Sequence, residues 1–250
     1  MKKVKLWDIL IPVFFFIGAI LAWEFIAKWY ASPFIFPAPT EIIYAFGEGL
    51  DRVSYHFILT LEGVVLGFII GVVIGTSLGI GIVYSGILKR IIFPVAIALR
   101  VTPLVAIAPI IVIWFGFGLS SKIVIAMIIT LFPIIINTSE GLQMVEPESI
   151  ELMQSIEATK AQIFRKLRLP SAMPSYFAGL KIAIGGAVIG AVLAEVVAPS
   201  SGLGYLVVLA TSYLDTPFLF ANVLVLFGMG IALFEIVVLL ERIIVPWKGK

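Results

Sequence analysis

Residues 57–84, FILTLEGVVLGFIIGVVIGTSLGIGIVY, decide the fold class of this chain. The stretch is long and apolar enough to cross a hydrocarbon layer, for which an α-helix needs about 20 residues. Glycines recur at every fourth position from Gly63 to Gly79, so a helix here carries a bare ridge that a second helix can approach closely. Such ridges are typical of helix packing in membranes, and a moving or subunit interface is the alternative. We therefore expect a helical membrane protein.

The composition of the whole chain agrees with this interpretation. The chain is 61% hydrophobic and 13% charged, whereas soluble domains are about 45–50% apolar. Its apolar runs predict six membrane spans, at Ile9–Ala27, Phe57–Tyr84, Ile91–Phe117, Ile123–Asn137, Tyr176–Ala198 and Phe220–Ile244. Pro103 and Pro109 should kink or break the third span, because proline lacks the amide N–H. No long polar linker interrupts the pattern, so residues 1–250 are predicted to form a single all-α membrane domain.

The basic residues predict how the chain is oriented in a cell membrane. With six spans, both termini and the segment 138–172 share one side, which also holds most of the Lys and Arg residues. The other side holds only Lys28, Arg52 and Lys122. Because Lys and Arg concentrate in cytoplasmic loops, we expect both termini to be cytoplasmic.

Two segments between the spans are expected to form short helices on the outer side. The first follows a proline-rich turn and starts at Thr40, whose side chain can act as an N-cap. The second lies within PSSGLGYLVVLATSYLDTP at 199–217, which begins with turn residues and is moderately apolar. We predict a short external or re-entrant helix in this second segment.

Two ionisable residues inside the spans are candidates for the translocation path. Arg100 lies just before Pro103, and Glu195 continues a row of small residues formed by Gly179, Ala183, Ala187 and Ala191. An ionisable group in a span costs a few kcal/mol even on lenient scales, so it faces protein or a water-filled cavity. Arg100 therefore either meets an anionic solute or forms a structural pair with Glu195, Glu62 or backbone carbonyls.

The sequence argues against enzymatic chemistry. The chain has no cysteine and one histidine, His56, so neither a thiolate site nor a histidine-rich metal site is expected. It contains no phosphate-binding loop, metalloprotease motif or serine nucleophile elbow. The net charge of +2 is too small to indicate nucleic-acid binding. We expect that this chain is not an enzyme and that it binds neither a metal nor a cofactor itself.

The segment 146–170, EPESIELMQSIEATKAQIFRKLRLP, is the most informative polar stretch. Acids gather at its start and bases at its end, as suits the helix dipole, and Pro170 is predicted to end the run. We expect one or two amphipathic helices outside the bilayer. They either lie on lipid headgroups or dock a cytoplasmic partner.

Several motifs together resemble one family, the membrane permease subunits of ATP-binding-cassette importers of the nitrate, sulfonate and taurine type. These are the inner-membrane components of binding-protein-dependent transport. The motifs are FPAPTEII at 36–43, LRVTPLVAIAPIIVIWFGFGLSSK at 99–122, FPIIINTSEGLQMVEPE at 132–148, IFRKLRLPSAMPSYFAGLKIA at 163–183 and AEVVAPSSGLGYL at 194–206. The resemblance covers nearly the whole chain.

The resemblance implies a type I importer fold (MetI-like) and a set of partners. These are a second permease subunit, expected to form a homodimer, a cytoplasmic ATPase dimer that binds ATP and Mg, and an external solute-binding protein. It also implies that 146–168 is the ATPase-coupling segment (EAA-like), with Glu151, Ile156, Glu157, Ala158, Lys160, Phe164 and Arg165 as its residues. Arg100 and Glu195 match polar positions of the family.

The expected function is import of a small anionic solute, such as a sulfonate, taurine or nitrate, or of a vitamin precursor. A proton-coupled secondary transporter that uses Glu195 is the alternative. Two residues depart from the family pattern. Glu62 stands where members often carry a basic residue, and Glu157 stands where the coupling segment has a turn glycine. Because glutamate adopts positive φ only with strain, we expect the turn to be shifted or replaced by continuous helix.

Overall fold

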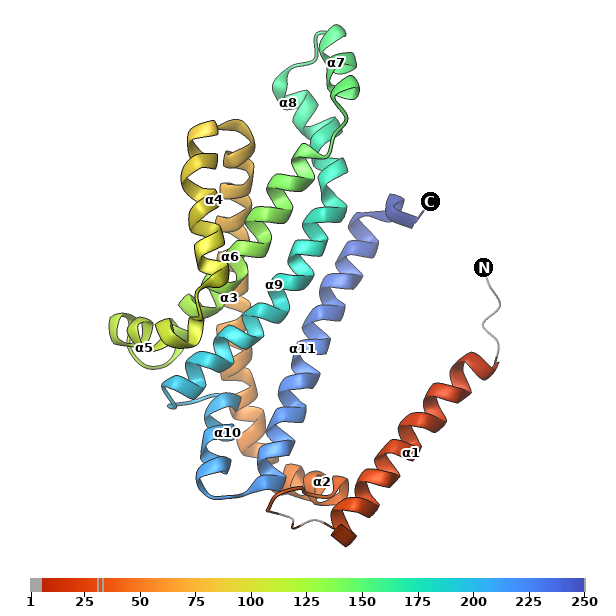
Figure 1. The fold of residues 1–250 in the computed structure, drawn as a ribbon, viewed down its shortest axis with the longest axis vertical. Coiled ribbons are helices and arrows are strands. Elements are labelled where there is room, and N and C mark those ends of the chain that lie inside the picture. Colours follow the sequence, from red (N-terminus) through yellow and green to blue (C-terminus); the bar gives the residue numbers. More distant parts are fainter. Residues whose placement is uncertain (1–5, 31, 33, 250) are drawn as a thin grey trace.

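The computed structural model describes residues 6–30, 32 and 34–249, and the regular elements within them are all helices (Figure 1). The side chains at 6–9, 30, 99, 100, 248 and 249 lie outside this description. The helices are α1 Leu6–Tyr30, α2 Pro39–Glu48, α3 Leu50–Tyr84, α4 Gly86–Val101, α5 Leu104–Phe115, α6 Leu119–Gln143, α7 Pro147–Ser155, α8 Lys160–Ile163, the π-helix Phe164–Arg168, α9 Leu169–Val197, α10 Leu203–Ser212, α11 Thr216–Ile244 and the 3₁₀-helix Pro246–Gly249.

Five helices are long and apolar enough to cross a membrane: α1, α3, α6, α11 and α9 together with the turns that precede it. The third predicted span is not one helix. It separates into α4 and α5 at Thr102 and Pro103, as the missing proline N–H predicts. Pro109, in contrast, is accommodated inside α5. The fourth span is longer than predicted and covers all of α6.

The glycine ridge of α3 packs against α6 of the same chain. Five glycines of α3 face five residues of α6 that also recur at every fourth position, from Lys122 to Thr138. A Cβ at Gly67 would lie 2.6 Å from the Cβ of Ala126, so the contact leaves no room for a side chain. The ridge is therefore an intrachain packing surface, and the subunit-interface alternative does not describe it.

The small-residue row of α9 packs on the same central helix. Ala183, Ala187 and Ala191 are fully buried, and α6 lies between α3 and α9 as the centre of the bundle. This close packing of α3, α6 and α9 is the core of the molecule. It places Glu195, the next residue of the row, inside the protein at 0% exposure.

The first helix stands apart from this core and is attached through α2 (Figure 1). Trp23 Nε1 donates to the carbonyl of Pro37 at 3.1 Å, and Thr40 Oγ1 donates to Glu24 Oε1 at 2.7 Å. The N-cap of α2 is thus Ala38 rather than the predicted Thr40, which is used to hold α1. The apolar side chains of α1 are mostly exposed in a single chain.

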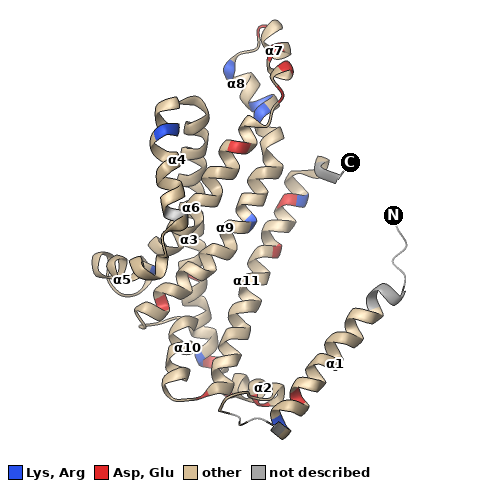
Figure 2. Cartoon of the chain, in the orientation of Figure 1, with Lys and Arg blue, Asp and Glu red and all other residues tan. Residues whose placement is uncertain are grey.

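The two ends of the molecule carry different short elements. Helices α7 and α8 protrude at one end, and α2 and α10 lie at the other (Figure 1). Helix α10 confirms the short helix predicted between the last two spans, and it packs against α9, α11 and α3. Figure 2 shows few charged residues along the middle of the long helices.

Candidate functional site

The protruding segment is a helix, a tight turn and a second helix. Helix α7 ends in a Schellman motif, in which the N–H of Glu157 donates to Gln154 O at 2.9 Å and the N–H of Ala158 donates to Met153 O at 3.0 Å. Glu157 occupies the position that favours glycine and has φ of +59°. The expectation of a shifted turn or a continuous helix is therefore wrong, since the turn is kept at Glu157 with a left-handed backbone.

A capping box explains why the helix does not continue through this turn. Thr159 N donates to Gln162 Oε1 at 2.7 Å, and Gln162 N donates to Thr159 Oγ1 at 3.3 Å. Two N-terminal donors of α8 are satisfied reciprocally, which fixes the start of α8 directly after Ala158. The sequence TKAQ at 159–162 carries this capping signal, which our sequence interpretation did not use.

The exposed face of this segment combines apolar and charged side chains. Ile156 is 68% exposed and Leu152 is 67% exposed, although both are apolar. Glu151, Glu157, Lys160 and Arg165 are also exposed, and Ala158 is partly buried. Such a mixed surface suits a protein partner, because apolar groups supply buried area and charges supply orientation.

Phe164 differs from the other predicted coupling residues because it faces the bundle. Its ring lies 6.3 Å from that of Tyr84 at the end of α3, in an edge-to-face arrangement. It also lines a mostly apolar cavity of about 180 Å³ between α3, α6 and α9. The structure thus connects the protruding segment to the core through this aromatic contact.

Pro170 does not end the run as predicted. Residues Phe164–Arg168 form a π-helical turn, and α9 continues directly from Leu169 through Pro170 to Val197. A π-turn widens the backbone, which relieves the clash between the proline ring and the carbonyl of residue 166. Helix α8, the π-helical turn and the long helix α9 therefore form one continuous rod, whereas α7 is separated from it by the turn at Glu157.

A buried ion pair joins three helices near the α2–α10 end. Lys122 Nζ of α6 lies 2.9 Å from Glu195 Oε1 of α9, and the two side chains are 3% and 0% exposed. Thr60 Oγ1 of α3 lies 2.8 and 3.0 Å from the two oxygens of Glu195. The carboxylate is thus paired and hydrogen-bonded, as a charge at this depth requires.

The same carboxylate holds the loop that leads into α10. Gly204 N donates to Glu195 Oε2 at 2.8 Å, and Leu203 N donates to Thr60 Oγ1 at 2.8 Å. Gly202 has φ of +111°, and a Cβ there would lie 1.9 Å from Glu195 Oε1, so only glycine fits. His56 Nδ1 accepts from Gly202 N at 2.9 Å. These contacts form a clamp, which we define as Thr60, Lys122, Glu195 and residues 202–204.

The clamp contains one of the two residues predicted for the translocation path. Glu195 pairs with Lys122, a residue that we had placed outside the fourth span, and its role in translocation stays a prediction. Arg100 lies near the end of α4, but its side chain is outside the described residues. Lys122 and Thr60 were missed because Lys122 lies at the polar start of α6 and Thr60 lies in the apolar run of α3, and only the packing of α3, α6 and α9 brings them together.

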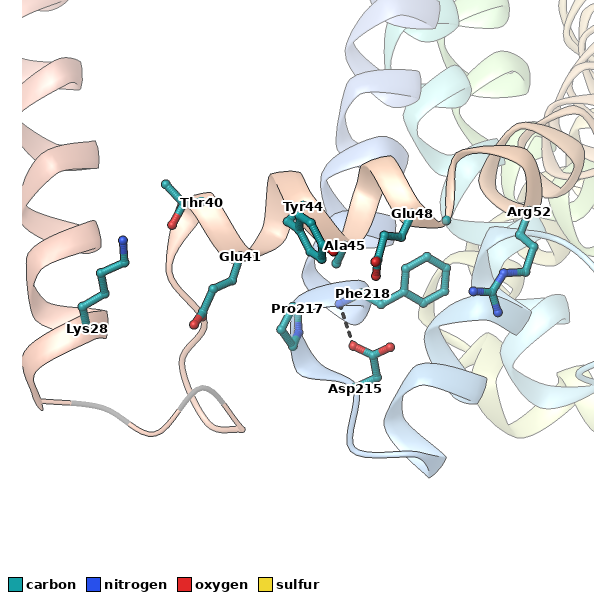
Figure 3. Close-up of a pocket in the computed structure, with 11 residues that line it drawn as sticks. Lys28, Thr40, Glu41, Tyr44, Ala45, Glu48, Arg52, Asp215, Pro217 and Phe218 are labelled. Atoms are coloured by element: carbon teal, nitrogen blue, oxygen red, sulfur yellow. Dashed lines mark hydrogen bonds between the residues drawn. The ribbon is translucent and has the colours of Figure 1, made fainter.

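A polar cavity of about 520 Å³ opens at the α2–α10 end (Figure 3). Figure 3 shows the Phe218 ring between Glu48 and Arg52, with Asp215 below it, where Asp215 Oδ1 accepts from Phe218 N at 3.2 Å. Arg52 lies 5.3 Å from the centre of the Phe218 ring. The hydrogen bond from Tyr44 to Glu48 raises the pKa of Tyr44. This end therefore presents charges of both signs to water.

Comparison with known proteins identifies the family. The model of the binding-protein-dependent transport system inner membrane component matches residues 63–249. The formylaminopyrimidine transport permease protein ThiX of Halalkalibacterium halodurans is 33% identical over 240 residues, which cover 96% of each chain. The riboflavin transport system permease protein RibX of Chloroflexus aurantiacus is 35% identical and covers 87% of this chain and 82% of its own.

A solved structure supports the fold. An inward-facing form of the MetNI methionine ABC transporter superimposes with a TM-score of 0.56 and 21% identity, covering 78% of this chain and 97% of the other. The expected type I importer fold is confirmed, and the comparisons do not support the proton-coupled alternative. The chain belongs to the family of binding-protein-dependent transport system inner membrane components, the permease subunits of ABC importers.

Proposed function

We propose that residues 146–168 receive the movement of a cytoplasmic ATPase and pass it to the core through α9. The permease family implies an ATPase and a solute-binding protein as partners. The observation that carries this proposal is the pair of exposed apolar side chains, Leu152 and Ile156, on a segment that protrudes beyond the bundle (Figure 1). Because α9 continues from this segment without a break, a push on α8 would move a core helix as a rigid body.

The orientation in the membrane and the composition of the complex are also part of this proposal. The α7–α8 end would be cytoplasmic, since it carries Lys160, Arg165, Lys166 and Arg168, and both termini would lie on that side. ATP and Mg would be bound by the ATPase alone. The exposed apolar face of α1 supports a second copy of the chain, because α1 is held within its own chain mainly by α2, together with a ring contact between Trp23 and Phe220 of α11.

The solute is proposed to be a small heteroaromatic vitamin precursor. ThiX is named for formylaminopyrimidine and RibX for riboflavin, and they are 33% and 35% identical to this chain. The aliphatic sulfonate permease protein SsuC of Bacillus subtilis is 29% identical and covers 88% of this chain. The higher identity to ThiX and RibX favours a vitamin precursor over a small anion such as a sulfonate as the solute.

The coupling proposal is tested by Ile156→Ser in the membrane complex. We expect this variant to lose most of the copurifying ATPase, because it removes apolar area from the contact. Met144→Ser is the matched control, since Met144 is 71% exposed just outside the segment. Equal ATPase recovery from the Ile156→Ser and Met144→Ser variants would contradict the proposal.

A further inference from the structure

Most charges within the spanning helices are paired or lie near a helix end. Glu195 pairs with Lys122, Glu24 with Lys28, and Lys181 with Glu241. Glu62 in α3 is different. Its side chain is exposed, and it makes no ion pair or hydrogen bond with any side chain that the structure describes.

Glu62 lies at membrane depth. It is about 18 Å from the α2–α10 end of α3 at 1.5 Å per residue, and the helix is about 52 Å long. A hydrocarbon layer of about 30 Å centred on α3 therefore includes this carboxylate. The neighbouring residue, Gly63, is packed against Lys122, so the backbone at Glu62 is held by the core.

The face of α3 that carries Glu62 is uncovered within the chain. The glycine ridge is buried against α6, whereas Ile58, Leu66 and Ile69 on the face of Glu62 are exposed. No basic residue of α3 lies within two turns on this face. Among the other exposed carboxylates that the structure describes in the long helices, Asp51 and Glu140 lie near helix ends. Glu235 in α11 has Arg242 two turns away on its own face.

We propose that Glu62 faces the water-filled route of the imported solute and makes this route unfavourable for anions. Lipid cannot cover the residue without a penalty of a few kcal/mol, and the described part of its own chain does not cover it. A water-filled route satisfies the carboxylate by hydration. Two copies of the chain would place two such carboxylates around one route, an arrangement that disfavours anions.

This proposal rests on the proposed function and makes it more specific. The favoured solutes are neutral or cationic molecules with hydrogen-bond donors, such as amines, amides or protonated heterocycles. Sulfonates, nitrate and bicarbonate are disfavoured, because a fixed negative charge at low dielectric repels them.

The absence of cysteine in the chain allows a direct test. Leu66→Cys places a thiol one turn from Glu62 on the same face, in the complete importer reconstituted in lipid vesicles. The thiol is labelled with a cationic and with an anionic methanethiosulfonate, and each labelling rate is divided by the rate of the same reagent with a free thiol. The labelling ratio is the normalised rate of the cationic reagent divided by that of the anionic reagent. We expect a labelling ratio of about ten, because the negative charge of Glu62 attracts the cationic reagent and repels the anionic one.

Variants at Glu62 test whether its carboxylate causes the preference for the cationic reagent. Glu62→Gln should reduce the ratio to near one, and Glu62→Asp should keep it. Copurification of the ATPase verifies that each variant is assembled. An unchanged ratio in Glu62→Gln would overturn the proposal.

A position that is expected to be dry, covered by lipid or by a second copy of the chain, calibrates the reagent. Phe15→Cys on the exposed face of α1 should be labelled slowly. If Leu66→Cys is labelled as slowly as Phe15→Cys, the face is dry and the proposal fails. Uptake of a labelled aminopyrimidine by the same vesicles tests the proposed solute separately, because the labelling ratio does not depend on which solute is carried.

Discussion

Replacing Glu157 by glycine should stabilise the turn of the coupling segment without changing its shape. Glu157 has φ of +59°, and its N–H already makes one of the two Schellman hydrogen bonds, at 2.9 Å. The side chain is exposed and makes no ion pair among the residues that the structure describes. The substitution therefore removes backbone strain and no described side-chain contact.

The size of the effect follows from two opposing contributions. A left-handed backbone costs a residue with a Cβ about 1–2 kcal/mol, and glycine avoids this cost. Glycine loses about 0.5–1 kcal/mol more backbone entropy on folding than other residues. The net stabilisation of the turn is thus about 0.5–1 kcal/mol, which corresponds to a two- to fivefold smaller equilibrium constant for opening, by RT of about 0.6 kcal/mol.

Hydrogen exchange of the Ala158 amide measures this opening. Its N–H donates to Met153 O, so its protection reports whether the turn is closed. Glu157→Ala is the matched control, because alanine removes the carboxylate but keeps the Cβ. Equal protection in Glu157→Gly and Glu157→Ala would refute the strain argument.

The same two variants separate strain from ATPase contact. If the turn is all that matters, Glu157→Gly should retain the ATPase. Loss of the ATPase in both variants would mean that the carboxylate makes a specific contact. Leu214→Gly relieves similar strain, at φ of +56°, in the Schellman turn that ends α10. It should leave ATPase recovery unchanged.

Two further predictions concern the core and are read from thermal unfolding in detergent. Lys122→Met should destabilise the protein by about 3–5 kcal/mol, because it leaves a buried carboxylate without its cation. The double variant Lys122→Met with Glu195→Gln should recover most of this loss, and no recovery would exclude the ion pair as the cause. Gly67→Ala should cost about 1–3 kcal/mol by overpacking the contact with α6. Gly18→Ala, with nothing within 4 Å, should cost nothing, and equal effects at both sites would contradict the close packing.

Much of the fold could be predicted because its signals are local. Apolar runs predict the spans, since each helix must match the thickness of the bilayer by itself. The break at Pro103 and the short helix Leu203–Ser212 follow from proline and turn residues nearby in the sequence. The boundaries were less accurate, because helices such as α3 extend beyond the apolar run into polar residues.

The candidate site could be predicted only in part. The coupling segment was found from its charges and its resemblance to a family, but its turn was misjudged. Intrinsic preference disfavours Glu157 in a left-handed conformation, and the capping box at Thr159 together with two Schellman hydrogen bonds overrides that preference. Local propensities cannot predict how such competing contacts combine.

The sequence by itself determined that this protein is a helical membrane protein with an amphipathic segment outside the bilayer, because hydrophobicity and charge patterns act over a few turns of chain. Its permease character came from the resemblance of its motifs to a known family. Only the tertiary structure decided that Lys122 forms an ion pair with Glu195, that the glycine ridge of α3 packs against α6, and that the side chain of Glu62 is exposed within the chain. These facts depend on which faces of distant helices are brought together. The partner of a charged residue in a membrane-spanning helix cannot be identified from the sequence, because it depends on which helices pack together. Small residues set the distance of that packing.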